Sequence, residues 1–186
     1  VSHEGRFNHK ICDCPPELKK ARFYEMKAAD IQKIDCGAHG HPHFPTQQKA
    51  AAYKPTLSQV FDSLERRFPN GAVRYNVEIK AGKFAYGKSQ PTAGQLAQKV
   101  YAALKERNLL QRCLIQSFDA ASLNALYALD PSLRLGFLVF SPKSIGANLK
   151  KLTFKPYTYN PYYIWAKKKT VRYAHERGIK VIPWTI

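Results

Sequence analysis

A short segment near the middle of the chain, Asn76-Val77-Glu78-Ile79-Lys80, alternates polar and apolar residues. Side chains alternate along a strand, so Asn76, Glu78 and Lys80 share one face and the apolar pair shares the other. If the apolar pair packs on helices, the polar face points into a barrel, where a Glu and a Lys need partners. A hard divalent cation for Glu78 and a phosphate for Lys80 would satisfy both. The alternative is a structural ion pair between the two side chains.

Histidines form a second set of candidates. His39, His41 and His43 alternate, and on a strand they would face one way, as zinc ligands can. Gly40 and Pro42 between them favour a loop instead, and no further ligands recur at zinc-finger spacing. We therefore expect these histidines to contact substrate at the rim of a site or to be plain surface.

From residue 55 onward, helical and strand patterns alternate with short connections, which is typical of an α/β protein with a parallel sheet. Helical patterns cover about residues 55–68, 94–108, 121–129, 145–152 and 164–177. Strand patterns cover about residues 73–80, 113–118, 135–140, 157–159 and 180–186, the last as a buried strand. Thr56 and Gln59 have the spacing of a capping box. Five strands, each preceded by a helix, fit either a doubly wound sheet or a closed barrel.

The first fifty residues show no such alternation. They are rich in Pro, His and Gly, with a short helical pattern near residues 28–34, and we expect residues 4–54 to form a long active-site loop. The cysteines follow no metal-ligand spacing. Cys12 and Cys14 are too close for an easy mutual disulfide, but either could pair with Cys36 in an exported protein.

The chain is strongly basic, with 30 Lys and Arg against 13 Asp and Glu and a formal charge of +17. No RNA-binding, zinc-finger or helix-turn-helix signature accompanies the lysines, so we expect no specific nucleic-acid binding. The charge predicts a solvated basic surface that attracts anionic substrates or membrane headgroups. No run of about 18 apolar residues and no leader pattern is present. The chain lacks an initiator Met and ends at Ile186 in an apolar run, so we expect both ends to cut through structure.

Three strings carry a resemblance to the glycerophosphodiester phosphodiesterase family, in the family's order and approximate spacing. They are Tyr75-Asn76-Val77-Glu78-Ile79-Lys80, Ile115-Gln116-Ser117-Phe118-Asp119 and Val181-Ile182-Pro183-Trp184-Thr185. The resemblance implies a TIM-type (β/α) barrel, incomplete here, which lacks the first two βα units and the last helix. Residues 4–54 would then be an insertion after the third strand.

The resemblance also implies site residues and a reaction. The enzyme would hydrolyse glycerophosphodiesters to glycerol 3-phosphate and an alcohol with a divalent cation, Ca²⁺ or Mg²⁺. Ser2-His3-Glu4 resembles the motif that supplies a catalytic His, here His3 as the acid for the leaving oxygen. Glu78 resembles the third acidic metal ligand and Lys80 the phosphate-binding Lys. Gln116 and Trp184 lie near strand ends as substrate contacts, although Trp184 could equally be a barrel-core plug.

The sequence departs from the family pattern in several places. Glu4 replaces the usual Asp, and His9 stands where many members have Arg. The family's upstream His-Arg and Glu-x-Asp motifs have no counterpart, so we expect this chain to be inactive by itself. The alternative function is a barrel without catalysis that binds anionic ligands. Family members occur on both sides of a membrane, and the resemblance favours export only slightly.

Overall fold

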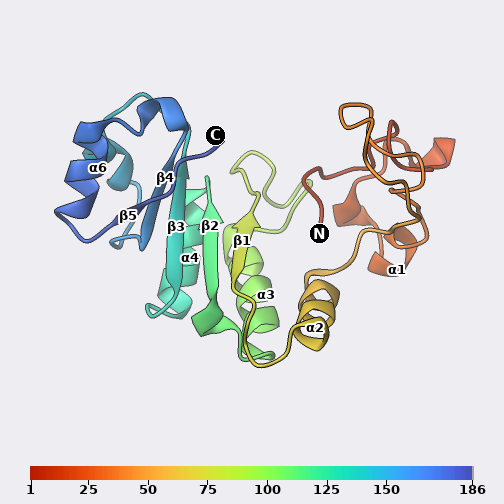
Figure 1. Ribbon diagram of the computed structural model, residues 1–186, viewed down its shortest axis with the longest axis horizontal. Helices are drawn as coiled ribbons and strands as arrows, with labels where there is room; N and C mark the ends of the chain where they lie inside the picture. Colours follow the sequence, from red (N-terminus) through yellow and green to blue (C-terminus); the bar gives the residue numbers. More distant parts are fainter. Residues whose placement is uncertain (186) are drawn as a thin grey trace. The chain divides into compact units, whose positions relative to one another are not determined.

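Five strands form a fully parallel sheet in the computed structural model, which describes residues 1–185 of the chain. Each strand pairs with the next one along the chain, so the order is β1-β2-β3-β4-β5 (Figure 1). The strands are β1 (Tyr75–Ile79), β2 (Cys113–Ser117), β3 (Arg134–Val139), β4 (Thr158–Pro161) and β5 (Lys180–Val181). This arrangement confirms the predicted α/β class with a parallel sheet.

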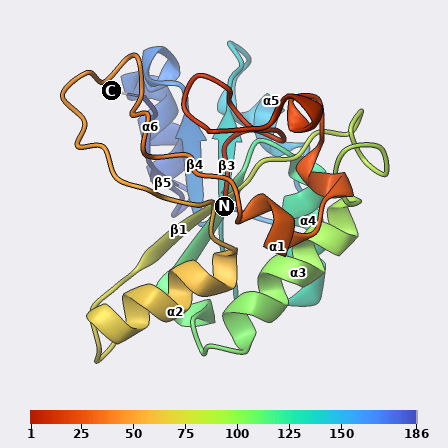
Figure 2. The same cartoon turned by 90° about the vertical axis from the view of Figure 1, so that its right-hand side faces the viewer.

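A helix precedes every strand, as predicted. The helices are α2 (Leu57–Arg67), α3 (Ala93–Lys105), α4 (Ala120–Leu129), α5 (Ile145–Leu149) and α6 (Lys168–His175), with 3₁₀ turns at Leu110–Arg112 and Tyr163–Trp165. The helix α4 packs on β2, β3 and α3, while α6 packs on β5 and α5; Figure 2 shows α3 and α4 side by side. Crossover helices of this kind are what allows neighbouring strands to run parallel.

The chain divides into two compact units. One consists of Val1–Asn70 with Lys88–Gln90, and the other of Gly71–Gly87 with Pro91–Ile186. The second unit contains the whole sheet together with α3, α4, α5 and α6. No helix within residues 1–185 has both the length and the apolar character that crossing a membrane would require.

The core of the second unit lies between the sheet and its helices. Strand β3 is buried from Leu135 to Val139, on both of its faces. On the helix side, Ile115 and Leu135 are each 1% exposed and occupy paired positions on β2 and β3. Burying side chains of this size stabilises the unit by roughly 1.5–3 kcal/mol each.

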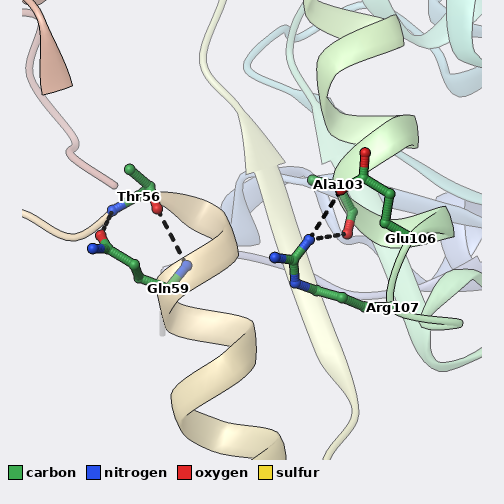
Figure 3. Close-up of polar contacts among 5 residues, drawn as sticks. All are labelled: Thr56, Gln59, Ala103, Glu106 and Arg107. Atoms are coloured by element: carbon green, nitrogen blue, oxygen red, sulfur yellow. Dashed lines mark hydrogen bonds and ion pairs between the residues drawn. The ribbon is translucent and has the colours of Figure 1, made fainter.

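Local hydrogen bonds determine where the helices begin. The Thr56 hydroxyl accepts from the Gln59 amide at 3.2 Å, and the Gln59 side chain accepts from the Thr56 amide at 2.8 Å (Figure 3). The predicted capping box is therefore present, and Thr92 and Gln95 form a second one at α3. At the other end of α3, Figure 3 shows Arg107 donating to the Ala103 carbonyl and pairing with Glu106. The Thr56 and Thr92 caps satisfy amides that a helix leaves unpaired at its start, whereas Arg107 donates to a carbonyl near the end of α3.

The first unit has a small core of its own. Phe7, Cys12 and Ile34 are buried together, and a disulfide joins Cys12 to Cys36. The Asp35 carboxylate accepts backbone hydrogen bonds from residues 37, 38 and 52, which lower the pKa of Asp35. Short helical turns connect this core, namely Pro16–Leu18, Phe23–Glu25 and α1 (Ala28–Ile31).

The last predicted strand differs most from the structure. Regular strand is confined to Lys180–Val181, although the Ile182 and Trp184 amides still donate to β4 and an isolated bridge forms at Trp184. Lys180 and Ile182 are exposed and Val181 is half-buried, so the expected burial is wrong over residues 180–185, and residue 186 lies outside the described residues. β5 is the last strand of the described sheet and only β4 flanks it, which explains why its residues stay partly exposed. Helix α6 also begins later than expected because Ala166, after the turn Tyr163–Trp165, has a backbone conformation outside the helical region.

Candidate functional site

Polar side chains from successive strands occupy one face of the sheet. Glu78 on β1 is in register with Gln116 on β2, and Gln116 with Gly136 on β3. Asn160 on β4 donates its side-chain N–H to the Gln116 Oε1 at 2.7 Å. Glu78, Gln116 and Asn160 each lie one residue before the carboxyl end of their strand, the end at which α/β barrels place their sites.

Gly136 makes the contact between β2 and β4 possible. A Cβ at this position would lie 2.6 Å from the Thr158 Oγ1 and 3.2 Å from both the Asn160 Nδ2 and the Gln116 Cβ. The absent side chain therefore leaves the room in which Gln116 and Asn160 meet across β3.

Asn160 is the central residue of this face, and the sequence analysis missed it. Its side chain is 1% exposed, and its backbone carbonyl accepts from the Trp184 indole N–H at 2.9 Å. Within residues 1–185, the Asn160 Oδ1 and the Thr158 Oγ1 are buried without a hydrogen-bond partner. Buried polar atoms of this kind are costly unless a ligand, water or further protein group meets them. The sequence did contain a signal for Asn160, because polar residues occupy the alternate positions 158 and 160. The same alternation identified Asn76 and Glu78 as candidates.

Aromatic rings gather beside Trp184 at the carboxyl ends of the strands. We call Phe118, Phe140, Tyr162, Trp165 and Trp184 the aromatic cluster. The Trp184 ring centroid lies 5.1 Å from that of Phe118, 5.2 Å from Tyr162 and 5.9 Å from Phe140. Trp184 is half-buried, so part of its surface remains accessible to a ligand.

Lys80 directly follows β1, and the loop after it is anchored. The Tyr86 hydroxyl donates to the Asp119 carboxylate and lies 3.3 Å from the Ser122 Oγ. Burial, and then the hydrogen bond to Asp119, raise the pKa of Tyr86 to about 12. Tyr86 is therefore a neutral donor at physiological pH. Asp119 also caps α4 by accepting from the Ser122 amide at 2.7 Å, so one carboxylate fixes both the loop and the helix.

The predicted site residues are distributed over both units. Glu78 and Lys80 are exposed in the second unit, together with Gln116 and Trp184, which Asn160 connects. His3 belongs to the first unit, where its Nδ1 lies 2.6 Å from the Glu4 Oε1 and both side chains are exposed. The roles assigned to these residues remain predictions.

The ligands for a divalent cation are incomplete. Within residues 1–185 no group of three or more His, Cys, Asp or Glu side chains is arranged to hold a metal ion. On the polar face Glu78 supplies a carboxylate, while the Gln116 Oε1 beside it already accepts from Asn160. The described residues thus fit one ligand of such a cation and do not form a site by themselves.

Comparisons with known proteins identify the family of this chain. Residues 13–186 match the glycerophosphoryl diester phosphodiesterase family. A curated relative, the glycerophosphodiester phosphodiesterase of Caldanaerobacter subterraneus, is 27% identical over 158 residues, which are 84% of this chain and 58% of the relative. The chain thus spans less than two thirds of that relative's length.

Solved structures are similar over the whole chain. A glycerophosphoryl diester phosphodiesterase homologue from Silicibacter pomeroyi has a TM-score of 0.81 at 19% identity, covering 100% of this chain and 68% of that one. A phosphodiesterase from Oleispira antarctica, solved with the product sn-glycerol-3-phosphate, has a TM-score of 0.70 at 18% identity, with 100% and 66% covered. The five-stranded sheet therefore represents about two thirds of a TIM-type barrel, which confirms the predicted fold.

Proposed function

Because this chain belongs to the glycerophosphoryl diester phosphodiesterase family over residues 13–186, we propose that it forms part of an enzyme that hydrolyses glycerophosphodiesters to glycerol 3-phosphate and an alcohol. The observation that carries the proposal is the polar face at the carboxyl edge of the sheet, where Glu78 and Gln116 are in register and Lys80 follows β1. The Oleispira antarctica structure, which holds sn-glycerol-3-phosphate, supports the same kind of product for this chain.

The chain's own residues divide the work of a phosphodiester hydrolysis. The Lys80 ammonium stabilises negative charge on the phosphate oxygens as the transition state forms. His3 delivers a proton to the departing alkoxide as the general acid. Gln116, held by Asn160, and the accessible surface of Trp184 contact the polar and C–H parts of the glycerol.

A divalent cation, Ca²⁺ or Mg²⁺, would supply charge neutralisation at the phosphate when bound. Glu78 fits as one of its ligands. Since the described residues form no group of three such ligands, we assign the remaining ligands to the His-Arg and Glu-x-Asp motifs that the family resemblance implies.

Hydrolysis of glycerophosphocholine by the full-length protein tests the proposal. We expect glycerol 3-phosphate to appear in the presence of Ca²⁺ or Mg²⁺ and to disappear after chelation. Absence of product from a folded, metal-loaded protein would contradict it.

The incomplete ligand set favours a second function, a barrel that binds anionic ligands without turnover. The sequence of the longer protein separates the two functions. A strand with His-Arg followed by one with Glu-x-Asp supports the enzyme, and their absence supports the binding module.

A further inference from the structure

The stretch of chain that forms β3, α5, β4 and α6 is basic and contains no acidic residue. From Pro131 to His175 the sequence holds seven lysines, two arginines and neither Asp nor Glu. Within residues 1–185, no ion pair involves the exposed lysines at the ends of two loops in this stretch, which are Lys143, Lys167, Lys168 and Lys169. Their charges are therefore not neutralised by the second unit itself.

Three of these residues surround a cleft at the carboxyl end of the sheet. The cleft has a volume of about 420 Å³, and Lys143, Lys167 and Lys169 line it together with Trp165 and Thr170. The volume lies within the range that small ligands occupy. A lining with three lysines, the hydroxyl-bearing residues Ser144, Thr170 and Tyr173, and no carboxylate suits an anion such as a phosphate.

Large apolar side chains are exposed on the same two loops. Phe140 is 66% exposed, and Tyr163 and Ile164 are each 48% exposed. The Phe140 ring lies 5.0 Å from the ring of Trp165, which lines the cleft, so the apolar and cationic groups adjoin. Aromatic rings beside lysines are the combination found where proteins meet the headgroup region of a bilayer.

We propose that residues 140–143 and 163–169, which we call the basic rim, dock on a membrane that contains anionic phospholipid. The phosphate of a lipid headgroup would enter the lysine-lined cleft, and Phe140, Tyr163 and Ile164 would lie at the level of the headgroups. Unpaired lysines complement the negative surface of such a membrane. The apolar side chains favour a bilayer over a nucleic acid, because phosphate-backbone binding gives exposed Ile and Phe nothing to pack on. This docking does not depend on the proposed hydrolytic activity.

Vesicle binding by the full-length protein tests the basic rim. The probe is vesicles of phosphatidylcholine with and without 30% phosphatidylglycerol, at low and at high salt. We expect binding only to the anionic vesicles and a loss of binding as salt rises. A lysine near a membrane surface contributes roughly a fivefold gain in affinity, so Lys143→Gln/Lys167→Gln/Lys169→Gln should weaken binding by more than about tenfold.

A matched triple variant provides the control. Lys150→Gln/Lys151→Gln/Lys155→Gln removes the same charge from the connection between α5 and β4, at the opposite edge of the sheet, and should weaken binding much less. Phe140→Ser/Ile164→Ser should weaken binding while the charge is unchanged. Equal losses in the two lysine variants, or no effect of the apolar substitutions, would overturn the proposal. It would also be overturned if duplex DNA or inorganic phosphate, but not vesicles, bound with the same dependence on the rim lysines.

Discussion

Two charged side chains, Glu78 and Lys80, stand two residues apart at the carboxyl end of β1. Substituting Glu78 by Gln keeps the shape of the side chain and removes its charge, which a Ca²⁺ or Mg²⁺ ligand needs. We expect Glu78→Gln to remove most activity of the full-length enzyme and to raise the metal concentration required for half-maximal rate. Glu106→Gln, at an exposed position after α3, is the control. Near-normal turnover with unchanged metal affinity in Glu78→Gln would exclude the ligand role.

Lys80 is predicted to act on the phosphate in the transition state. Lys80→Ala should lower kcat/KM by roughly two to four orders of magnitude, as when one preorganised donor is lost. Lys80→Arg should restore activity only in part, since a planar guanidinium cannot occupy the place of an ammonium. Lys99→Ala, exposed on α3, should be neutral. A purely structural Lys80 would show the reverse, a lower melting temperature with normal kinetics.

At the scale of the elements, Gly136 allows three strands to share one polar face. Gly136→Ala places a Cβ 2.6 Å from the Thr158 Oγ1, and we expect it to lower the free energy of unfolding by roughly 1–3 kcal/mol. Gly94→Ala in α3 is the control, because nothing lies within 4 Å of its Cβ and alanine favours a helix. Denaturant titration of both variants measures the difference. Equal stability of the two would show that the sheet relaxes around the added methyl.

The loop after Lys80 depends on the hydrogen bond from Tyr86 to Asp119. Tyr86→Phe removes the donor, and we expect a loss of about 1 kcal/mol of stability at pH 8, allowing for partial exposure. The pKa of Tyr86 is raised to about 12 in the folded protein, so this contribution is complete below the ordinary tyrosine pKa of about 10 and is lost as pH rises toward 12.

Unfolding measured at pH 8 and at pH 11.5 checks this expectation. The advantage of the native protein over Tyr86→Phe should shrink at the higher pH. Tyr127→Phe is the control, since the Tyr127 ring stacks on Phe154 at 4.5 Å and its hydroxyl makes no hydrogen bond within residues 1–185. A pH-independent difference would mean that Tyr86 contributes through its ring.

The sequence predicted those elements whose signals are local. Thr56 and Gln59 lie within one turn, so their spacing alone identified the start of α2. Gln116 and Asn160 are 44 residues apart and meet only because β3 has a glycine between them, which no local pattern reveals. The prediction that the last strand is buried was wrong for a similar reason. An apolar run near residue 180 indicates burial only if another element covers it.

At the scale of the whole molecule, the chain covers 58% of its curated relative, and we expect it to be inactive by itself. We expect the 186-residue chain to show no metal-dependent turnover of glycerophosphocholine, because residues 1–185 hold no cluster of three metal ligands. We also expect aggregation, since β1 and β5 end the sheet and unpaired strand edges recruit other chains.

A version of the chain extended upstream shows whether inactivity comes from missing metal ligands and catalytic side chains or from low stability. The extended protein should be active and monomeric under conditions in which the short chain is neither. Turnover by the short chain at a comparable rate would show that the ligands were wrongly placed outside it.

The order of the strands has a consequence for how the protein is made. Every strand pairs with the strand that precedes or follows it in sequence. Each pairing therefore closes a loop that contains a single crossover connection. Because the ribosome synthesises the chain from its amino terminus, each βα unit can join the growing sheet as it emerges, before more distant segments are made. The sheet behaves in this respect like a repeat array, in which stability accumulates through nearest neighbours. Its interior, centred on the buried β3, should resist amide exchange longest, and its two outer strands should open first.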